Sequence, residues 1–232
     1  MTESRAQEPM TRLGVIVGST RPGRRGAAVA EWVEQVAFRH ASVVSGRASV
    51  DVIDLAEHAL PLLDEPMPAM FAEYRNPHTQ RWAAVVASFD AFVFVTPEYN
   101  HSVPAALKNA IDFLYAEWAD KAAGLVGYGV QGGTRAVDHL RLILAEVRAV
   151  VVPTQVALSV FTDFDLAGTD PADPTAAGVL APGEGPTETL FTMLTEVVAW
   201  SQALRSLRHS DPSPGPSSPR EQEPVPAAER VS

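Results

Sequence analysis

Residues 18–26 combine small, hydroxyl and arginine side chains in a short segment between an apolar run and a helical pattern. At such a strand-to-helix turn, backbone N–H groups and the positive end of the helix dipole bind phosphate. The segment lacks the Gly-Lys-Ser/Thr of a P-loop and the Gly-x-Gly-x-x-Gly of a dinucleotide fingerprint. It therefore predicts a cradle for one phosphate group, the alternative being a tight turn with surface arginines. The candidate contacts are Ser19, Thr20, Arg21, Arg24, Arg25 and Gly26.

A second segment whose residues could bind a ligand, residues 96–104, follows the clearest strand pattern of the chain. A flat heterocycle needs a slot with an apolar or aromatic wall and polar groups along one edge. Pro97 and Tyr99 can form such a wall, and Asn100 can meet ring carbonyls or hold the loop. We expect Glu98 to close the loop through hydrogen bonds rather than to act as a catalytic acid. We expect His101 to be an exposed loop residue.

A third segment, residues 127–134, is rich in glycine: Gly127, Gly129, Gly132 and Gly133 fall within seven positions. Glycine is costly in folding unless the backbone adopts a positive φ or approaches another group closely. We therefore expect this turn, which includes Tyr128, to lie against the far edge of the same ligand.

Alternating strand and helix patterns must position these three segments. Helical spacing is found at 26–37, 104–116, 135–147 and 187–207, and short apolar runs predict strands at 13–17, 49–55, 90–96, 124–130 and 150–160. Such alternation implies parallel strands with right-handed crossovers and helices on both faces. We predict a flavodoxin-like three-layer α/β/α sandwich with strand order 2-1-3-4-5. Ligands of such sheets bind beyond the strand carboxyl ends, between strands 1 and 3.

The rest of the chain is predicted to lie outside this core. We expect residues 1–10 to be a flexible tail, residues 11–208 to form the domain, and residues 162–186 to be a long surface loop within it. Residues 209–232 are rich in proline and serine and predict a disordered tail.

Composition limits the function. The formal net charge of the 232 residues is −10, which argues against a nucleic-acid binder and makes the arginine cluster more informative. No apolar run reaches the ~20 residues that span a bilayer, so we expect no membrane insertion. The chain has no cysteine, which excludes disulfides and thiol chemistry, and no secretory segment is recognisable. A cytoplasmic protein is the expectation.

Three segments, GSTRPGRRG, TPEYNHSVPAALKNAIDFLY and GYGVQGGTRAVDHLR, resemble the NADPH-dependent FMN reductase family, which includes flavin, quinone, azo-dye and chromate reductases. The resemblance covers about residues 12–160. It implies that the phosphate of FMN is held by Ser19, Arg21, Arg24, Arg25 and Gly26. It also implies that the ring is bordered by Pro97, Glu98, Tyr99, Asn100, Gly127, Tyr128, Gly129 and Gly132. The chain departs from many relatives at residues 24–26, where Ser or Asn is common, and at residue 127, where Ser is frequent.

The resemblance further implies a two-step reaction in which NADPH, or NADH, reduces the flavin and a small acceptor then takes the electrons. The acceptor could be a quinone, a flavin, an azo or nitro compound or a metal oxyanion. No side chain is expected to be catalytic, because the flavin carries the chemistry, and no metal site is predicted. Two alternatives stay open: a non-enzymatic flavodoxin-type electron carrier, and a flavin-free regulatory domain.

Relatives imply a homodimer or a dimer of dimers. Apolar residues near the 104–118 helix could form part of the interface or could pack in the core: Ile111, Phe113, Leu114 and Trp118.

Overall fold

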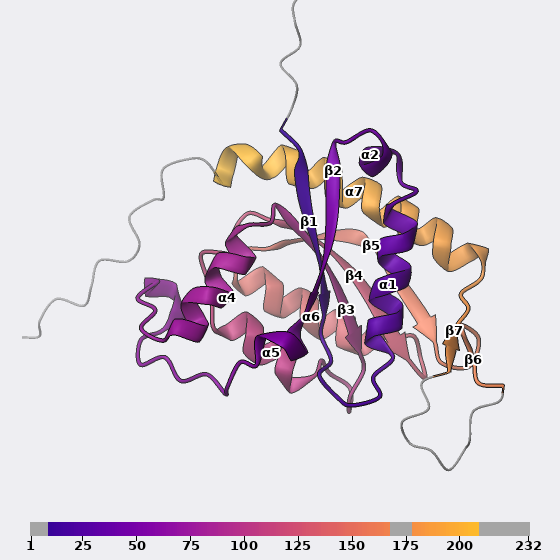
Figure 1. Ribbon diagram of the computed structural model, residues 1–232, viewed down its shortest axis with the longest axis horizontal. Coiled ribbons are helices and arrows are strands. Elements are labelled where there is room, and N and C mark those ends of the chain that lie inside the picture. Colours follow the sequence, from indigo (N-terminus) through magenta and orange to yellow (C-terminus); the bar gives the residue numbers. More distant parts are fainter. Residues whose placement is uncertain (1–8, 168–177, 209–232) are drawn as a thin grey trace, which may run out of the picture.

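The computed structural model describes residues 9–167 and 178–208. Its main sheet is parallel and has the order β2-β1-β3-β4-β5, as predicted. The strands are β1 (Thr11–Val17), β2 (Ala48–Asp54), β3 (Ala91–Pro97), β4 (Ala122–Gly129) and β5 (Val150–Ser159). Because all five run the same way, their carboxyl ends meet along one edge of the sheet (Figure 1).

Helices cover both faces of the sheet (Figure 1). One face packs against α1 (Gly26–Ala37) and α7 (Glu184–Arg208). The other packs against α4 (Pro77–Ala87), α5 (Ala105–Asp112) and α6 (Thr134–Glu146). Short helices α2 (Ala41–Val44), α3 (Leu55–His58) and η1 (Ala69–Phe71) lie in the connections. The three-layer α/β/α prediction is confirmed.

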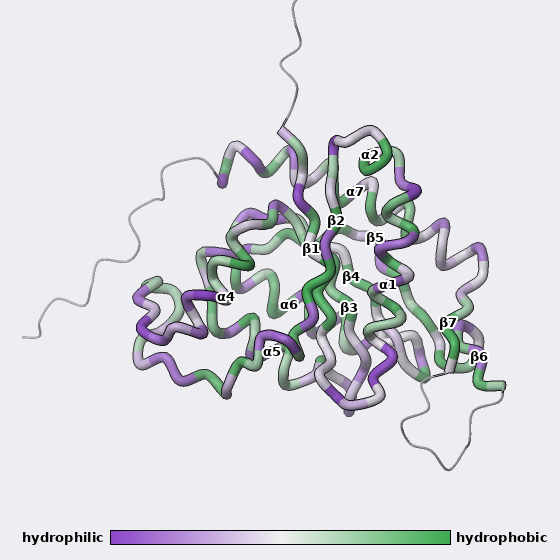
Figure 2. The backbone as a smooth tube through the Cα atoms, in the orientation of Figure 1, coloured by the Kyte–Doolittle hydropathy of each residue, from purple (hydrophilic) through white to green (hydrophobic). Residues whose placement is uncertain are grey.

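The central strands explain this layering. Every residue of β3 is buried, with Val93 and Val95 on the α1 side and Phe92 and Phe94 on the α5 side. Side chains of a strand alternate between its faces, so one apolar run supplies two cores. Figure 2 shows the resulting apolar centre of the sheet.

Strand β5 lies at the sheet edge and accommodates Pro153, which cannot donate a ladder hydrogen bond. The register against β4 shifts between Ala123 and Leu125. Beyond the proline, Glu196 of α7 accepts hydrogen bonds from the Thr154 amide (3.1 Å) and hydroxyl (2.8 Å). The predicted strand therefore continues past Pro153.

Several sequence-based expectations need correction. The predicted 162–186 loop contains an antiparallel pair, β6 (Phe164–Asp165) and β7 (Val179–Leu180), and the start of α7. The pair forms because buried Phe164 anchors it against Tyr128. Sequence patterns predicted no element for α4, and the helix predicted over 104–116 ends at Asp112. Residues 1–8 and the predicted 209–232 tail lie outside the described residues.

The residues considered for a subunit interface belong to the core of this chain. Ile111, Phe113, Leu114 and Trp118 are at most 1% exposed. They pack with Phe92 and other residues between the sheet and α4–α6. Core packing is therefore the correct interpretation of these four side chains.

Candidate functional site

The three segments singled out in the sequence leave the carboxyl ends of β1, β3 and β4, and hydrogen bonds connect them. The hydroxyls of Ser19 and Tyr99 lie 2.8 Å apart and join the first segment to the second. The amide of Glu98 donates to the carbonyl of Tyr128 at 3.1 Å and joins the second to the third. The sheet therefore brings the predicted site residues to one edge.

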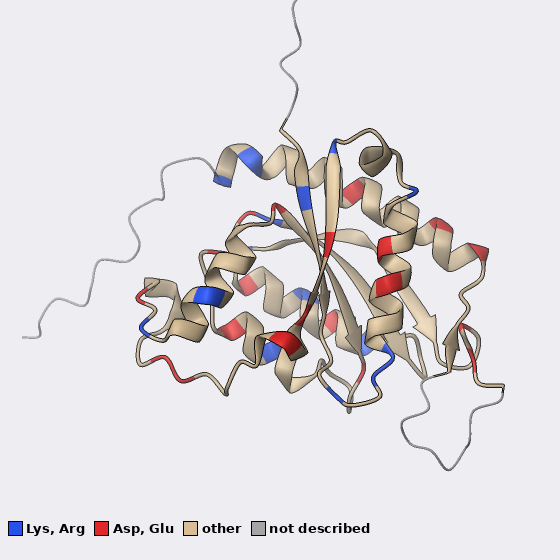
Figure 3. Cartoon of the chain, viewed as in Figure 1, with Lys and Arg blue, Asp and Glu red and all other residues tan. Residues whose placement is uncertain are grey.

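The first segment ends at the N-terminus of α1, where the described residues provide no side-chain cap. Arg24 N–H donates to the carbonyl of Arg21 (3.1 Å), and Gly23 between them has a φ of 66°. With Pro22 before it, this is the geometry of a type II turn. Within the described residues no side chain caps α1 after Arg25, and its first turn holds no acidic residue. Free N–H groups and basic side chains therefore meet at this end of α1 (Figure 3).

The three arginines of this turn differ in their surroundings. Arg24 forms an ion pair with Asp54 at the end of β2, while its Nε is buried without a partner in the described structure. The guanidinium of Arg25 lies 5.5 Å from the ring centroid of Phe164. Arg21 is exposed. Asp54 and Phe164 were not expected from the sequence to contact this turn.

The Tyr128 side chain points to the α1 side of the sheet, where it is only 5% exposed. Its hydroxyl has no hydrogen-bond partner among the described residues. Burial raises the pKa of Tyr128, as does nearby Tyr99, while the charges of the three arginines of the turn act in the opposite direction. A buried, protonated hydroxyl without an acceptor, close to the arginines, fits a ligand that brings acceptor oxygens.

The second segment folds into a very short hairpin. Tyr99 and Ser102 exchange two backbone hydrogen bonds (2.9 and 3.1 Å). Asn100 and His101 between them have φ angles of 50° and 75°. Two consecutive positive φ values are typical of a type I′ turn, in which Asn is favoured. Asn100 and His101 are exposed at the tip, so the expectation for His101 is confirmed.

An ion pair holds this hairpin against α6. Glu98, whose side chain is 9% exposed, pairs with Arg135 and accepts the Arg135 backbone N–H at 3.2 Å. Arg135 Nη1 also lies 2.6 Å from Nε2 of His101, which accepts because the guanidinium can only donate. The contacts match the structural role expected for Glu98. Sequence reasoning missed Arg135, although it lies within a motif segment.

The glycines of the third segment are required mainly by the turn itself. Gly132 and Gly133 both have a φ of 69°. A Cβ on Gly127 would lie 2.7 Å from the carbonyl oxygen of Gly132, and one on Gly133 would lie 2.6 Å from the Tyr128 nitrogen. At Gly129 the nearest atom would be 3.5 Å away. The turn therefore packs closely on its own backbone and presents Gly129 beside Glu98.

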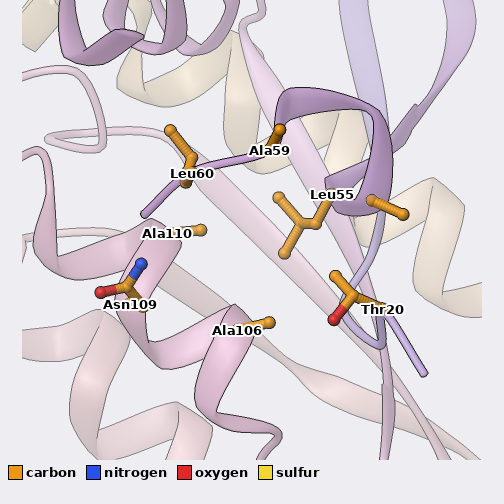
Figure 4. Close-up of a pocket in the computed structure, with 8 residues that line it drawn as sticks. Thr20, Leu55, Ala59, Leu60, Ala106, Asn109 and Ala110 are labelled. Atoms are coloured by element: carbon orange, nitrogen blue, oxygen red, sulfur yellow. The ribbon is translucent and has the colours of Figure 1, made fainter. Parts of the chain in front are cut away.

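A small cavity of about 260 Å³ opens beside the first segment, between α3 and α5 (Figure 4). Thr20, Leu55 and Ala106 are among its lining residues. The Asn109 amide at its wall is already bonded to the backbone of Pro61 and Leu63. Ligand pockets for drug-sized molecules measure ~300–1,000 Å³, so this cavity is too small to hold a flavin by itself.

The described residues carry neither a cluster of metal-ligating side chains nor a membrane-spanning helix. They contain no group of three or more His, Asp or Glu placed to hold a metal ion. Their helices include none that is both long and apolar enough to cross a membrane.

The fold defines a flavodoxin-like α/β protein, and its arginine-rich helix end at the β1–β3 switch point is a candidate anion site. A family model described as NADPH-dependent FMN reductase matches residues 11–163, and the chain belongs to that family. The resemblance inferred from the three segments is thereby confirmed.

Individual relatives are similar over most of the same region. An NAD(P)H-dependent FMN reductase of Nectria sp. is 38% identical over 154 residues, which cover 64% of this chain and 75% of the relative. A 2-hydroxy-1,4-benzoquinone reductase of Burkholderia sp. is 30% identical over 141 residues, which cover 58% of this chain and 70% of the relative. The structure of a flavoenzyme NAD(P)H:(acceptor) oxidoreductase from Paracoccus denitrificans aligns with a TM-score of 0.60 at 22% identity. That alignment covers 84% of this chain and 98% of the other and supports the fold.

Proposed function

We propose that this protein is an FMN-containing reductase that passes electrons from NADPH or NADH to a small acceptor. Family membership gives the class of reaction. The structural observation that carries the proposal is the end of α1, where arginines lie together with helix N–H groups that have no side-chain cap and a Tyr128 hydroxyl that has no partner, both judged over residues 9–167 and 178–208. A phosphate ester satisfies these groups because it offers negative charge and several acceptor oxygens.

In this proposal the first segment binds the phosphate through Ser19, Arg21, Arg24, Arg25 and Gly26. The second and third segments border the ring through Pro97, Glu98, Tyr99, Asn100, Gly127, Tyr128, Gly129 and Gly132. Glu98 and Arg135 keep the hairpin in place, and the Ser19–Tyr99 contact holds it at the phosphate turn. Bound FMN supplies hydride acceptance and electron transfer, so no protein nucleophile is needed.

A quinone is the acceptor that we propose first, because one of the relatives is named for benzoquinone reduction. Flavins, azo or nitro compounds and metal oxyanions are the further candidates. We also propose that the protein acts in the cytoplasm as a homodimer or a dimer of dimers. Its surface is not expected to bind nucleic acid, since the net charge of −10 repels phosphate chains.

The absorbance spectrum of the purified protein tests the proposal. We expect flavin bands, either as purified or after addition of FMN, that bleach within seconds when NADPH is added without oxygen. A benzoquinone added next should restore them. Flavin bands that stay oxidised would favour the electron-carrier alternative. Protein that neither is yellow nor binds FMN would favour the flavin-free regulatory domain.

A further inference from the structure

The Tyr128 hydroxyl is a buried polar group with no partner in the described part of the chain. The other tyrosine at this edge differs, because the Tyr99 hydroxyl is bonded to Ser19 at 2.8 Å. Buried hydroxyls are nearly always satisfied by protein, water or ligand. The described residues provide no acceptor for the Tyr128 hydroxyl, and a ligand bound at this edge could provide one.

The hydroxyl lies over the first residue of α1. A Cβ built on Gly26 would be 2.8 Å from Tyr128 Oη, so the absence of a side chain there leaves room for it. On the other side, the Phe164 ring lies 6.5 Å from the tyrosine ring. Strand alternation puts Tyr128 on this face together with Val126, away from the face of Leu125. The side chain is thus directed at the helix end.

The charges around this hydroxyl favour an anion. Arg21, Arg24 and Arg25 are close enough to influence its pKa, and burial keeps that pKa above its usual value. The hydroxyl therefore stays protonated and can donate. A hydrogen-bond donor in a region of positive charge suits the terminal oxygens of a phosphate monoester, which are negatively charged acceptors.

We infer that Tyr128 Oη donates a hydrogen bond to a phosphate oxygen of FMN at the end of α1 and so selects FMN over riboflavin. This inference rests on the proposed function. It gives Tyr128 a role at the phosphate, in addition to the ring-bordering position that its backbone occupies. Gly26 takes part by leaving space for the hydroxyl.

Flavin titrations of the unloaded full-length protein test the inference. We expect Tyr128→Phe to weaken FMN binding by about tenfold to a hundredfold, the effect of one hydrogen bond to a charged group. Riboflavin, which lacks the phosphate, should bind the variant and the wild type equally, as measured by quenching of flavin fluorescence. Tyr74→Phe is the matched control: its hydroxyl donates to Glu117 (2.8 Å), and its loss should change neither affinity.

A second variant tests the space that the Tyr128 hydroxyl occupies beside Gly26. Gly26→Ala places a methyl group against Tyr128 Oη and should weaken FMN binding, but should add little to the loss in the Tyr128→Phe background. Equal weakening of FMN and riboflavin in Tyr128→Phe, or no change in either, would overturn the inference. Wild-type protein that binds neither flavin would instead overturn the proposed function on which it rests.

Discussion

Replacement of Arg135 by methionine should destabilise the protein, because the Glu98 carboxylate would lose the positive charge with which it pairs. The Glu98 side chain is 9% exposed, and Arg135 provides both its ion pair and the backbone N–H that it accepts. Methionine keeps the length of the side chain and the backbone N–H but removes the charge. The carboxylate would then be buried with a single hydrogen bond at the N-terminus of α6.

The expected loss follows from this geometry. Removal of one partner from a fully buried ion pair costs about 3–5 kcal/mol, because the other charge is left uncompensated. Arg135 is 38% exposed, so water reaches part of the pair, and the α6 dipole still favours the carboxylate. We therefore expect a loss of about 2 kcal/mol in the free energy of unfolding, or roughly 4–8 °C in Tm. Glu98→Gln should cost less, about 1 kcal/mol, because a neutral amide can accept the same N–H.

Urea unfolding of the flavin-free protein measures these values. The control is Arg148→Met, since Arg148 also pairs with a carboxylate, that of Asp120, but the Arg148 side chain is 60% exposed. That variant should lose less than 1 kcal/mol, as surface pairs do. The double variant Glu98→Gln/Arg135→Met should lose less than the two single variants together. If Arg135→Met is no less stable than Arg148→Met, the assignment of Glu98 as a structural carboxylate that needs its partner is refuted.

Three other outcomes are expected. Burial, with the charge of Arg208, lowers the pKa of Lys121 to about 8 from its ordinary 10.5. The unfolded chain therefore binds more protons than the folded protein between these pH values, and the free energy of unfolding should rise with pH across them. Urea unfolding at pH 7.5 and 9.5 should show this rise in the wild type and not in Lys121→Met. Gly133→Ala should lower the free energy of unfolding by more than about 2 kcal/mol in the same assay, because Gly133 has a φ of 69° and a Cβ there would meet the Tyr128 nitrogen. Gly129→Ala should lower it by less than about 1 kcal/mol, because a Cβ there would have room. Exposed Arg21→Ala should leave stability unchanged but weaken FMN binding about tenfold; unchanged FMN affinity would remove Arg21 from the cradle.

The sheet was predictable because its central strands, β1, β3 and β4, are buried on both faces and therefore form nearly continuous apolar runs in the sequence. The run that became β3 is the clearest example. Helix α4 escaped prediction because its buried face consists of only Thr79, Trp82 and Val86. The β6–β7 pair escaped because strands of two residues are too short to show alternation.

The positions of the three site segments were also predictable, since strand order alone brings them to one edge. Their mutual contacts were not. Glu98 and Arg135 are 37 positions apart, and only the folded turn brings the carboxylate to the start of α6. Asp54 likewise meets Arg24 because β2 ends beside the first segment. Opposite charges far apart in sequence have many possible partners until the topology is known.

The start of α1 is arranged against the electrostatics of the helix itself. Carboxylates stabilise a helix N-terminus and cations destabilise it, yet the first turn holds no acidic residue and follows three arginines. The Tyr128 hydroxyl and the Nε of Arg24 add buried polar groups that the described structure leaves without partners. Each feature opposes folding of the chain alone, and a bound phosphate ester would satisfy all of them together. These features, each of which disfavours the folded state, support the proposed phosphate position at the start of α1 more strongly than the small cavity beside the turn does.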